Sequence, residues 1–455
     1  MFDRALIQKC QKNAPRYTSY PTADRFSSAF DSKLQLTQLQ SLQQKNTQPI
    51  SLYIHIPFCN TLCLFCGCNK IITNDKTNIS RYLNYLEREI QTYHAIIGKR
   101  LDVMQLHFGG GSPSWMSLED LARVMAMIKQ YFNLDHAREI AMEVDPRHTT
   151  TNFIESLHQH GFNRLSLGVQ DLDATVQKAI NRIQPLTQNM QVLAAANTFN
   201  FKSTNIDLIY GLPFQSMKSF EVTIDHVTNL MHPARIALFN YAHIPSLFMP
   251  QTRINEDDLP KDAEKLDMLQ MSVAKLIAAG YVFIGMDHFA LPTDELAIAL
   301  KNGTLQRNFQ GYSTFADTNM LAFGVSAIGF IGDSYYQNTK DLNEYYKLVD
   351  AGALPIMRGV KLNDDDLLRR QIIQDIMCQF ALDFTKTSNT FNIDFAQYFA
   401  AELGRLLELQ QLELITLTAN GFQVTPRGRF LIRNVAMVFD KYLTDTKHTR
   451  HSKTI

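Results

Sequence analysis

The chain has 455 residues, 45% of them hydrophobic, with 44 basic and 44 acidic side chains. It is long enough for two or three domains with a sizeable core. Zero net charge excludes a global field that would attract nucleic acid or an anionic membrane, and no apolar run is long enough to span a bilayer.

The N-terminal region is poor in regular periodicity. Residues 1–10 mix charged and apolar side chains, so they lack the pattern of a secretory signal. Residues 15–22, PRYTSYPT, contain two prolines, two tyrosines and an arginine. This composition predicts an extended, ordered strap rather than a helix, and by itself indicates a surface-packed tail.

A cysteine-rich loop follows the first strand-like run. Four of the six cysteines lie within residues 51–70, SLYIHIPFCNTLCLFCGCNK, and three of them, Cys59, Cys63 and Cys66, have the spacing C-x3-C-x2-C. Such a loop can place three thiolates around one inorganic centre. Structural zinc is the first alternative, but it usually takes a second C-x2-C or H-x3-H pair, which the sequence lacks. An iron–sulfur cube normally takes four thiolates, so three leave one iron open to a small molecule.

The remaining cysteines have simpler interpretations. Cys68 is close enough in sequence to compete as a ligand, whereas Cys10 and Cys378 are expected to be small buried apolar residues. Free cysteines at cluster spacing indicate a reducing compartment, which we take to be the cytoplasm.

Strand-like runs then alternate with helical patterns. The runs are 51–56, 104–108, 139–144, 164–168, 203–208 and 235–239. Repeated βα units predict a parallel sheet with helices outside it, as an open or partial barrel. One helical pattern is 117–131, with Ser117 and Asp120 as its cap. In parallel barrels the active site lies at the C-terminal ends of the strands.

Unusual residues follow the six runs at these ends. After the cysteine loop they are Gly109, Gly110, Gly111, Ser112 and Pro113, then Glu143, Asp145 and Arg147, then Gln170 and Asp171, then Asp207, and finally Asn240, Tyr241, Ala242 and His243. Three consecutive glycines predict a close approach of backbone to a ligand, since a tight turn explains only one. Glu143 is either a ligand contact or a solvated rim carboxylate. Asp207, between two apolar residues, needs a polar partner, and Arg182 by default is an exposed loop charge.

These motifs resemble a known family. The C-x3-C-x2-C loop resembles the signature of radical S-adenosylmethionine enzymes. PRYTSYPT, CGCNK, GFNRLS, GVQD, NIDLIYGLP, FNYAH, GMDHFA and NFQGY resemble oxygen-independent coproporphyrinogen III oxidases (dehydrogenases) over nearly the full length. Two departures are Ser112, where threonine is expected, and Leu291, where arginine is expected.

The resemblance implies a set of site residues. Cys59, Cys63 and Cys66 would hold one 4Fe-4S cluster, and a first S-adenosylmethionine would complete its fourth iron. Contacts to that molecule would be Tyr53, Gly110, Glu143 and Ile328. A second S-adenosylmethionine would contact Phe65, Gly111, Ser112, Gln170, Arg182, Asp207 and Ala242. Residues implied in activity without an assigned role are His55, Cys68, Phe309 and Gln310. The PRYTSYPT strap would cover the active site.

The reaction implied by the resemblance is the anaerobic oxidative decarboxylation of two propionates of coproporphyrinogen III to vinyl groups. It gives protoporphyrinogen IX in haem biosynthesis, through a 5'-deoxyadenosyl radical made from S-adenosylmethionine. A small redox protein would supply electrons, and we expect a cytoplasmic monomer that binds neither nucleic acid nor membrane. Arg16 and Arg307 are candidates for binding the substrate carboxylates.

Two other functions stay open. A haem-carrying chaperone related to this enzyme would share the cysteine loop, but is expected to lack both Cys68 and the NFQGY string. A zinc-stabilised binding protein is the non-enzymatic alternative, which metal analysis would distinguish from an iron–sulfur enzyme.

We expect four regions in the chain: an N-terminal strap at 1–47, a radical-SAM-type partial (β/α)6 TIM-like barrel at 48–290, a barrel extension at 291–360, and a mostly helical, winged-helix-like domain at 361–455. The last region predicts helices at 363–377, 394–410 and 425–443, and a hairpin at 412–424 around Asn420-Gly421. Arg427, Arg429 and Arg433 would suggest DNA binding, but with aspartates nearby they indicate a solvated or inter-domain face. This domain is expected to cap the barrel or bind substrate.

Overall fold

The computed structural model describes residues 3–44, 48–315 and 318–444. The chain divides into two compact units. The barrel unit comprises Phe26–Glu264 and Asp317–Lys361, and the mixed unit comprises Met1–Arg25, Lys265–Ala316 and Leu362–Ile455. The predicted strap at 1–47, including residues 45–47, and the predicted domain at 361–455 extend into positions outside the described residues. The domain boundaries from sequence stay predictions.

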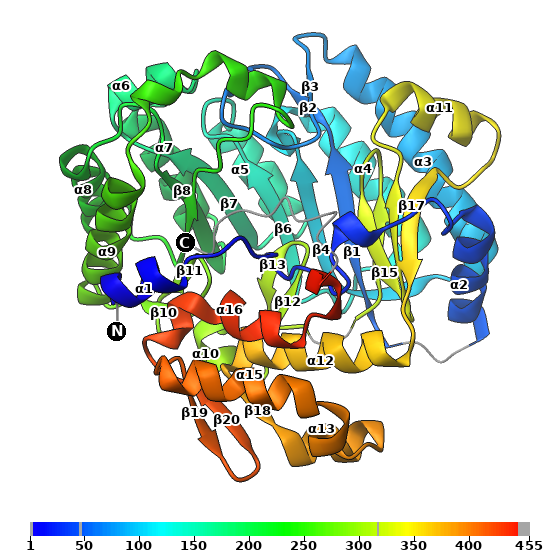
Figure 1. The fold of residues 1–455 in the computed structure, drawn as a ribbon. Coiled ribbons are helices and arrows are strands. Elements are labelled where there is room, and N and C mark those ends of the chain that lie inside the picture. Colours follow the sequence, from blue (N-terminus) through cyan, green and yellow to red (C-terminus); the bar gives the residue numbers. More distant parts are fainter. Residues whose placement is uncertain (1–2, 45–47, 316–317, 445–455) are drawn as a thin grey trace. The chain divides into compact units, whose positions relative to one another are not determined.

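Six strands of the barrel unit run parallel in a twisted sheet (Figure 1). Their order is β9-β8-β7-β6-β4-β1. The bounds are β1 (Ile50–Ile56), β4 (Leu101–Gly110), β6 (Glu139–Val144), β7 (Arg164–Gln170), β8 (Ser203–Tyr210) and β9 (Arg235–Asn240). Each strand contains the run predicted from sequence, so the parallel βα architecture is confirmed. Consecutive strands are neighbours because a helical crossover joins each pair.

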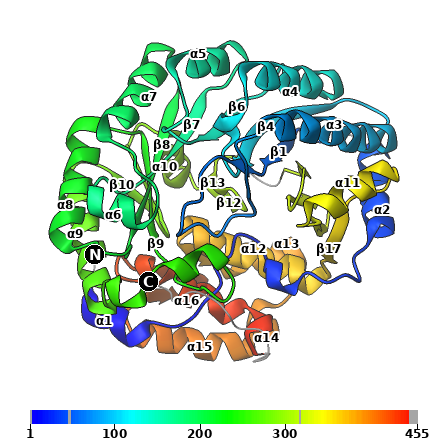
Figure 2. The same ribbon diagram turned by 90° about the horizontal axis from the view of Figure 1, so that it is seen from above.

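Helices cover the outer face of this sheet (Figure 2). They are α3 (Thr77–Ile97), α4 (Leu118–Tyr131), α5 (Thr151–Gln159), α6 (Ala174–Ala179), α7 (Leu186–Thr198) and α8 (Met217–His226). Helix α4 begins with the predicted cap, in which the Ser117 side chain accepts from the Asp120 N–H and the Asp120 carboxylate accepts from the Ser117 N–H. None of the described helices is long and apolar enough to cross a membrane.

Four further strands extend the sheet beyond β1. Strand β14 (Met320–Phe323) pairs parallel with β1, and β15 (Ile328–Ile331), β16 (Ser334–Asn338) and β17 (Ile356–Lys361) continue in antiparallel order. Helices α2 (Ser32–Gln44) and α11 (Leu342–Asp350) complete this side. In the strand order of the described residues β9 and β17 do not pair, so the barrel is partial, as predicted.

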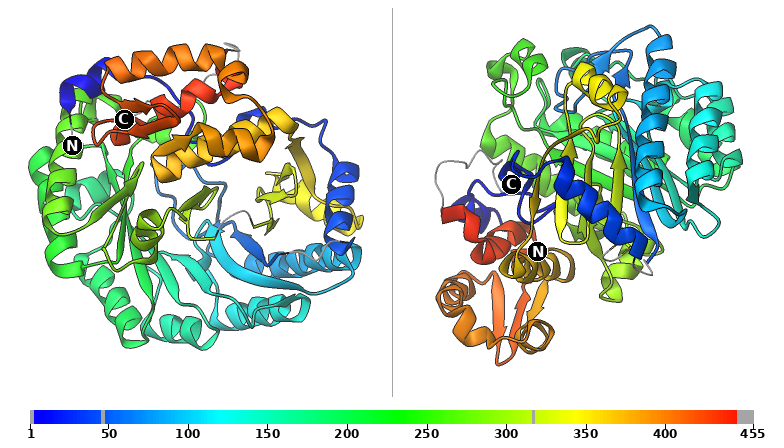
Figure 3. Two further views of the ribbon diagram at one scale, coloured as in Figure 1. Left: turned by 90° about the horizontal axis from the view of Figure 1, so that it is seen from below. Right: turned by 90° about the vertical axis from the view of Figure 1, so that its right-hand side faces the viewer.

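The mixed unit contains a small three-stranded sheet with helices packed around it (Figure 3). Its order is β18 (Ala381–Asp383), β20 (Gly421–Val424) and β19 (Ile415–Thr418). The other elements are α1 (Arg4–Cys10), α10 (Glu295–Lys301), α12 (Asp364–Gln379), α13 (Phe384–Phe391), α14 (Phe395–Tyr398), α15 (Ala400–Gln411), α16 (Ile432–Ala436), and the hairpins β10 (Val282–Gly285) with β11 (His288–Ala290) and β12 (Gln306–Asn308) with β13 (Gly311–Ser313). Helix α9 (Asp262–Ala278) begins in the barrel unit and continues into this one.

Three local predictions for this unit were wrong in detail. The hairpin turns at Ala419-Asn420, because Thr418 pairs with Gly421. Gly421 lies inside the strand, where a Cβ would be 2.1 Å from the Leu382 carbonyl oxygen. The predicted helix at 394–410 divides into α14 and α15 at Phe399, whose ring packs on Phe395 and Phe439. The helix expected at 425–443 is replaced by short helical turns around α16.

The strap at 15–22 has no helix, as predicted, and its tyrosines are buried. Tyr17 and Tyr20 are 3% and 2% exposed, and the Tyr17 hydroxyl donates to Asp440 at 3.0 Å. The arginines of the C-terminal region are occupied within the unit: Arg433 is buried and donates to the Ala14 carbonyl at 2.9 Å, and Arg429 lies over the Phe380 ring. Of the two alternatives expected from sequence, a solvated or an inter-domain face, the solvated one does not hold for Arg433.

Candidate active site

The cysteine loop begins and ends in two short strands that pair with each other. Strand β2 (Phe58–Cys59) pairs parallel with β3 (Ile71–Ile72). Between them the loop is tied to the turn after α6: the Leu64 N–H donates to Ile180 O at 3.0 Å, and Asn181 Nδ2 donates to Leu62 O at 2.8 Å. The loop is thus fixed beside the segment that carries Arg182.

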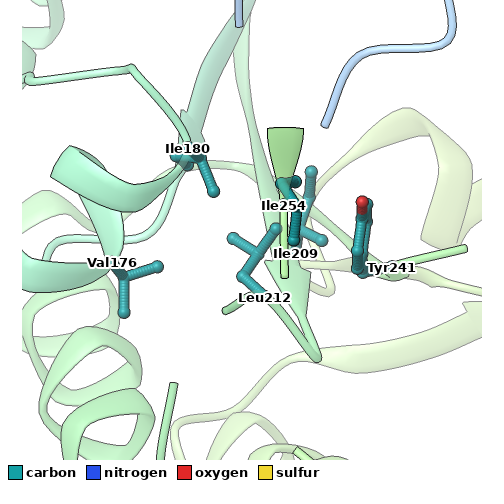
Figure 4. Close-up of a cluster of buried hydrophobic side chains, with 6 residues drawn as sticks. All are labelled: Val176, Ile180, Ile209, Leu212, Tyr241 and Ile254. Carbon is teal, nitrogen blue, oxygen red and sulfur yellow. The ribbon is translucent and has the colours of Figure 1, made fainter. Parts of the chain in front are cut away.

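A cluster of buried apolar side chains supports the loop (Figure 4). Its members are Val176, Ile180, Ile209, Leu212, Tyr241 and Ile254. Leu64 and Phe65 of the cysteine loop pack against this cluster. Gln251 Nε2 donates to the carbonyls of both Phe65 (3.0 Å) and Ala242 (3.1 Å), so these two expected cofactor contacts are close together. Sequence reasoning missed Gln251, because a single glutamine in a loop carries no pattern.

The three cysteines of the C-x3-C-x2-C motif differ in burial. Cys59 and Cys63 are buried and Cys66 is partly buried, whereas Cys68 is exposed. Burial raises the pKa of Cys59 to about 11, while the Ser112 hydroxyl, which donates to its sulfur at 3.6 Å, lowers it and the charges of Cys66 and Cys63 raise it. A hydrogen bond from Cys68 and the charge of Lys70 lower the pKa of Cys66 to about 6.

The three thiols of this loop have the donor chemistry of an iron–sulfur site. The loop supplies three thiols, and a ligand thiol must lose its proton to bind metal. Across the described ranges no three His, Cys, Asp or Glu side chains are grouped to hold a single metal ion. Cys68 donates its N–H to the Cys66 sulfur at 3.5 Å.

The three glycines after β4 are each required by a different neighbour. A Cβ at Gly109 would lie 2.9 Å from Glu143 Oε1, one at Gly110 2.7 Å from the His55 ring, and one at Gly111 2.7 Å from the Pro57 carbonyl carbon. Gly110 also has a φ of +116°, which side-chain-bearing residues rarely adopt. These close approaches are to protein neighbours, and the approach of this backbone to a ligand stays a prediction.

Tyr53, His55 and Glu143 surround this glycine loop. The Tyr53 hydroxyl lies 3.1 Å from His55 Nδ1, and His55 Nε2 lies 3.2 Å from the Asn69 carbonyl. Because a carbonyl only accepts, His55 Nε2 carries the proton and Nδ1 accepts from Tyr53. Burial lowers the pKa of His55, which favours this neutral form.

Glu143 is held as a carboxylate at the same place. Its oxygens accept from the Gly110 N–H at 3.3 Å and face His107 Nε2 at 3.4 Å. Burial opposes ionisation, but the His107 contact and the Gly110 N–H outweigh it and lower the pKa of Glu143. A charged Glu143 can accept hydrogen bonds from an ammonium or a ribose hydroxyl group.

The next group of predicted site residues comes from the segments around β7 and β8: Gln170, Arg182 and Asp207. Arg182 is 7% exposed and donates through Nη2 to Gly168 O at 2.6 Å, so its default interpretation as an exposed loop charge was wrong. A Cβ at Gly168 would meet Gln170 Nε2 at 2.8 Å and Arg182 Nη2 at 3.1 Å. The polar partner expected for Asp207 is Asn205, which donates at 2.7 Å. Burial, and next the charge of Glu143, raise the pKa of Asp207 to about 7.

A buried carboxylate missed by the sequence analysis holds the segment before Ile328. Glu89, 2% exposed on α3, accepts from the Gly324 N–H (2.8 Å), Tyr345 hydroxyl (2.6 Å) and Asn338 side chain (2.7 Å). The hydroxyl of Tyr82, two turns earlier on the same face of α3, accepts from the Val325 N–H and donates to His55 O. Helix α3 thus fixes both His55 and the turn that leads into β15.

We expect stability to fall with rising pH through Glu89. Burial, partly offset by its three donors, raises the pKa of Glu89 from 4.5 to about 7. Between these values the folded state keeps a proton that the unfolded state has lost, so stability present below pH 4.5 is lost as the pH rises to about 7. The loss is about 3 kcal/mol. The described neighbours Tyr82, Tyr93, Tyr336 and Tyr345 stay neutral here, because burial raises their pKa values.

Glu89→Gln tests this expectation. Urea unfolding at about pH 5 and about pH 8 should show a smaller loss of unfolding free energy in the variant, by up to about 3 kcal/mol. The matched control is Glu155→Gln, an exposed carboxylate on α5. An identical pH dependence in Glu89→Gln and the unmodified protein would contradict the expectation.

Two predicted site residues lie in the mixed unit rather than with the cysteine loop. Phe309 and Gln310 form the turn between β12 and β13, and the Gln310 N–H donates to Asn308 Oδ1 at 2.8 Å. Arg16 and Arg307, the candidates for substrate carboxylates, also belong to the mixed unit, and the remaining predicted residues belong to the barrel unit. Ile328 begins β15, two residues after Ser326, whose hydroxyl is 3.5 Å from His55 Nε2.

Comparison with known proteins places these features in a family context. The Radical SAM superfamily model matches residues 53–227, and the HemN C-terminal domain model matches residues 362–431. Oxygen-independent coproporphyrinogen III oxidase of Salmonella typhimurium is 46% identical over 442 residues, covering 97% of this chain and 96% of the relative. The enzyme of the same description from Pseudomonas aeruginosa is 46% identical and covers 100% and 99%.

A solved structure agrees with these relatives. Coproporphyrinogen III oxidase from Escherichia coli, described as a radical SAM enzyme, superposes with a TM-score of 0.92. It is 44% identical and covers 97% of this chain and 99% of its own.

Proposed function

The chain belongs to the oxygen-independent coproporphyrinogen III oxidases, and from this premise we propose that it converts two propionate side chains of coproporphyrinogen III to vinyl groups. The product is protoporphyrinogen IX, and the reaction needs no oxygen. The observation that carries the proposal is 46% identity over 97% of the chain, with the C-x3-C-x2-C loop intact.

Membership of the radical SAM superfamily implies a 4Fe-4S cluster and S-adenosylmethionine. We assign the cluster to Cys59, Cys63 and Cys66, the three thiols with the C-x3-C-x2-C spacing. When bound, the cluster and S-adenosylmethionine supply a radical able to remove an unactivated hydrogen from a propionate. The protein itself binds, orients and excludes water.

We assign the first S-adenosylmethionine to Tyr53, Gly110, Glu143 and Ile328. The charged Glu143 and the open backbone at Gly110 support this assignment. A second molecule is assigned to Phe65, Gly111, Ser112, Gln170, Arg182, Asp207 and Ala242. The contacts of Arg182 with Gly168 and of Gln251 with Phe65 and Ala242 support it, since they bring most of this set onto neighbouring loops. His55, Cys68, Phe309 and Gln310 are proposed to be required for activity.

The deciding experiment is an anaerobic assay with coproporphyrinogen III, S-adenosylmethionine and a reductant. Protoporphyrinogen IX and 5'-deoxyadenosine should form together. Formation of 5'-deoxyadenosine without protoporphyrinogen would favour another radical reaction, and tight haem binding without either product would favour a haem chaperone. One zinc and no iron in anaerobically purified protein would overturn the proposal.

Arg307 is our candidate for binding a substrate carboxylate. It is 7% exposed, and among the described residues its Nε and Nη1 have no hydrogen-bond acceptor. Its guanidinium lies 4.7 Å from the ring centre of Tyr312, its partner across the β12–β13 hairpin, next to the turn of Phe309 and Gln310. A buried guanidinium without an acid favours an anionic ligand. Arg16, the other candidate, is already paired with Asp287.

Replacing Arg307 with glutamine should raise the KM for coproporphyrinogen III about tenfold to a hundredfold, because a charge-assisted hydrogen bond is lost. Cluster content should not change. The matched control is Arg405→Gln, an arginine of the same unit that is exposed and paired with Glu402. Equal KM values for Arg307→Gln and the control would rule out a carboxylate contact.

We also propose that a small redox protein donates the electron and that the enzyme works as a monomer in the cytoplasm. Three reduced thiols at cluster spacing support a reducing compartment. Light scattering during size-exclusion chromatography should give the mass of one 52.0 kDa chain.

A further inference from the structure

Asp145 lies directly after β6, at the end of the strand nearest the cysteine loop, and binds two arginines. It is 4% exposed, and its N–H donates to Ser114 Oγ at 2.9 Å. Its carboxylate accepts from Arg147 Nη2 at 2.6 Å and from Arg182 Nη1 at 3.1 Å. Burial opposes ionisation, but the charges of Arg182 and Arg147 outweigh it and lower the pKa of Asp145 to about 2. The group therefore carries one negative and two positive charges at neutral pH.

Both guanidinium groups also reach the same sulfur. Arg147 Nη2 and Arg182 Nη1 each lie 3.5 Å from Cys63 Sγ. A guanidinium can do this because its planar fork presents several N–H groups at once. A nitrogen that binds the Asp145 carboxylate can therefore also face the Cys63 sulfur. Cys63 thus has two N–H donors and one excess positive charge beside it.

The reduction potential of an iron–sulfur cluster depends on its net charge and on hydrogen bonds to its sulfurs. We propose that Arg147 and Arg182, both anchored by Asp145, set the reduction potential of the cluster by donating to the Cys63 sulfur. Their positive charge stabilises the reduced cluster, which has gained an electron, and so raises its potential. Asp145 acts here as a positioning residue, through the two arginines. This inference rests on the proposed function, because it takes Cys63 as a cluster ligand.

The test is a redox titration of the reconstituted enzyme, followed by electron paramagnetic resonance, without substrate. Arg147→Gln should make the cluster about tenfold harder to reduce at a given potential, which is a shift of 59 mV to lower potential for one electron. Arg147→Lys keeps the charge and should shift it less. Asp145→Asn should alter the potential as well, because both arginines lose their shared anchor.

Arg164→Gln is the matched control. Arg164 begins β7 and pairs with Glu139, the first residue of β6, at 2.7 Å. This buried ion pair lies at the opposite end of the same two strands, so breaking it should cost stability without changing the potential.

The outcomes separate this inference from the proposed function. Arg147→Gln and Arg147→Lys proteins with full iron and sulfide and an unchanged potential would overturn the tuning role alone. An unmodified protein that assembles no iron–sulfur cluster would overturn the proposed function. A cluster of shifted potential in Arg147→Gln supports the inference whether or not protoporphyrinogen is formed.

Discussion

Replacing Cys63 with alanine is expected to abolish cluster assembly and turnover together. The loop offers only three thiols in the C-x3-C-x2-C pattern, and Cys63 is the one that both Arg147 and Arg182 contact. With two thiolates left, a cube would have two irons without a protein ligand, and the site that orients S-adenosylmethionine would be lost. Iron and sulfide after anaerobic reconstitution should fall to background, and 5'-deoxyadenosine should be undetectable.

Cys378→Ala is the control for this loss. Cys378 is also buried, but it lies on α12 in the mixed unit and has no role in the cysteine loop. The variant should lose about 1 kcal/mol of stability through a small cavity and keep its iron. Full iron and sulfide in Cys63→Ala would show that another residue takes its place and would end the three-thiolate assignment.

The second large effect is expected at Gly111. An alanine Cβ there would lie 2.7 Å from the carbonyl carbon of Pro57 and 2.9 Å from Phe58 O. These are backbone atoms directly before Cys59, so they cannot move aside as a side chain can. The Gly111 N–H donates to Ile56 O at 2.8 Å, and this bond must lengthen.

We expect Gly111→Ala to cost about 1–3 kcal/mol of stability through overpacking. It should also weaken S-adenosylmethionine binding at least about tenfold, or 1.4 kcal/mol, because the glycine loop moves away from the cysteine loop. Binding can be measured by equilibrium dialysis on the reconstituted protein. The control is Gly404→Ala on α15, where a Cβ meets nothing within 4 Å and should add about 0.5–1 kcal/mol of stability. Unchanged binding in Gly111→Ala would contradict the assignment of this loop.

The regular part of the fold could be predicted from sequence because its signals are local. Each of the six strands combines a short β-rich run with a helical pattern after it, and parallel topology then brings the strand ends together. This is why Glu143, Gln170 and Asp207 could be placed at one end of the sheet before any coordinates. The cap at Ser117 was predictable for the same reason, since a capping box is contained in four residues.

The rest depends on contacts between residues distant in sequence. Glu89 accepts a hydrogen bond from the N–H of Gly324, which is 235 positions away in the sequence. Arg147 contacts Cys63 across 84 positions. No local sequence pattern joins the residues of either pair. Gly421 shows how a local rule for hairpin turns can put the turn at the wrong residues. Asn420-Gly421 has the composition of a hairpin turn, but β18 approaches Gly421 so closely that the glycine is needed inside the strand.

The path of the chain through the two units affects how the nascent chain can fold on the ribosome. The barrel unit is interrupted after Glu264 and resumes at Asp317, and its later part supplies β14, the neighbour of β1. A nascent chain that has reached only about residue 300 therefore has one side of β1 unpaired, and it lacks Ser326, Ile328 and the partners of Glu89. Residues 317–361 must therefore be made before β1 gains its second neighbour and Glu89 its partners.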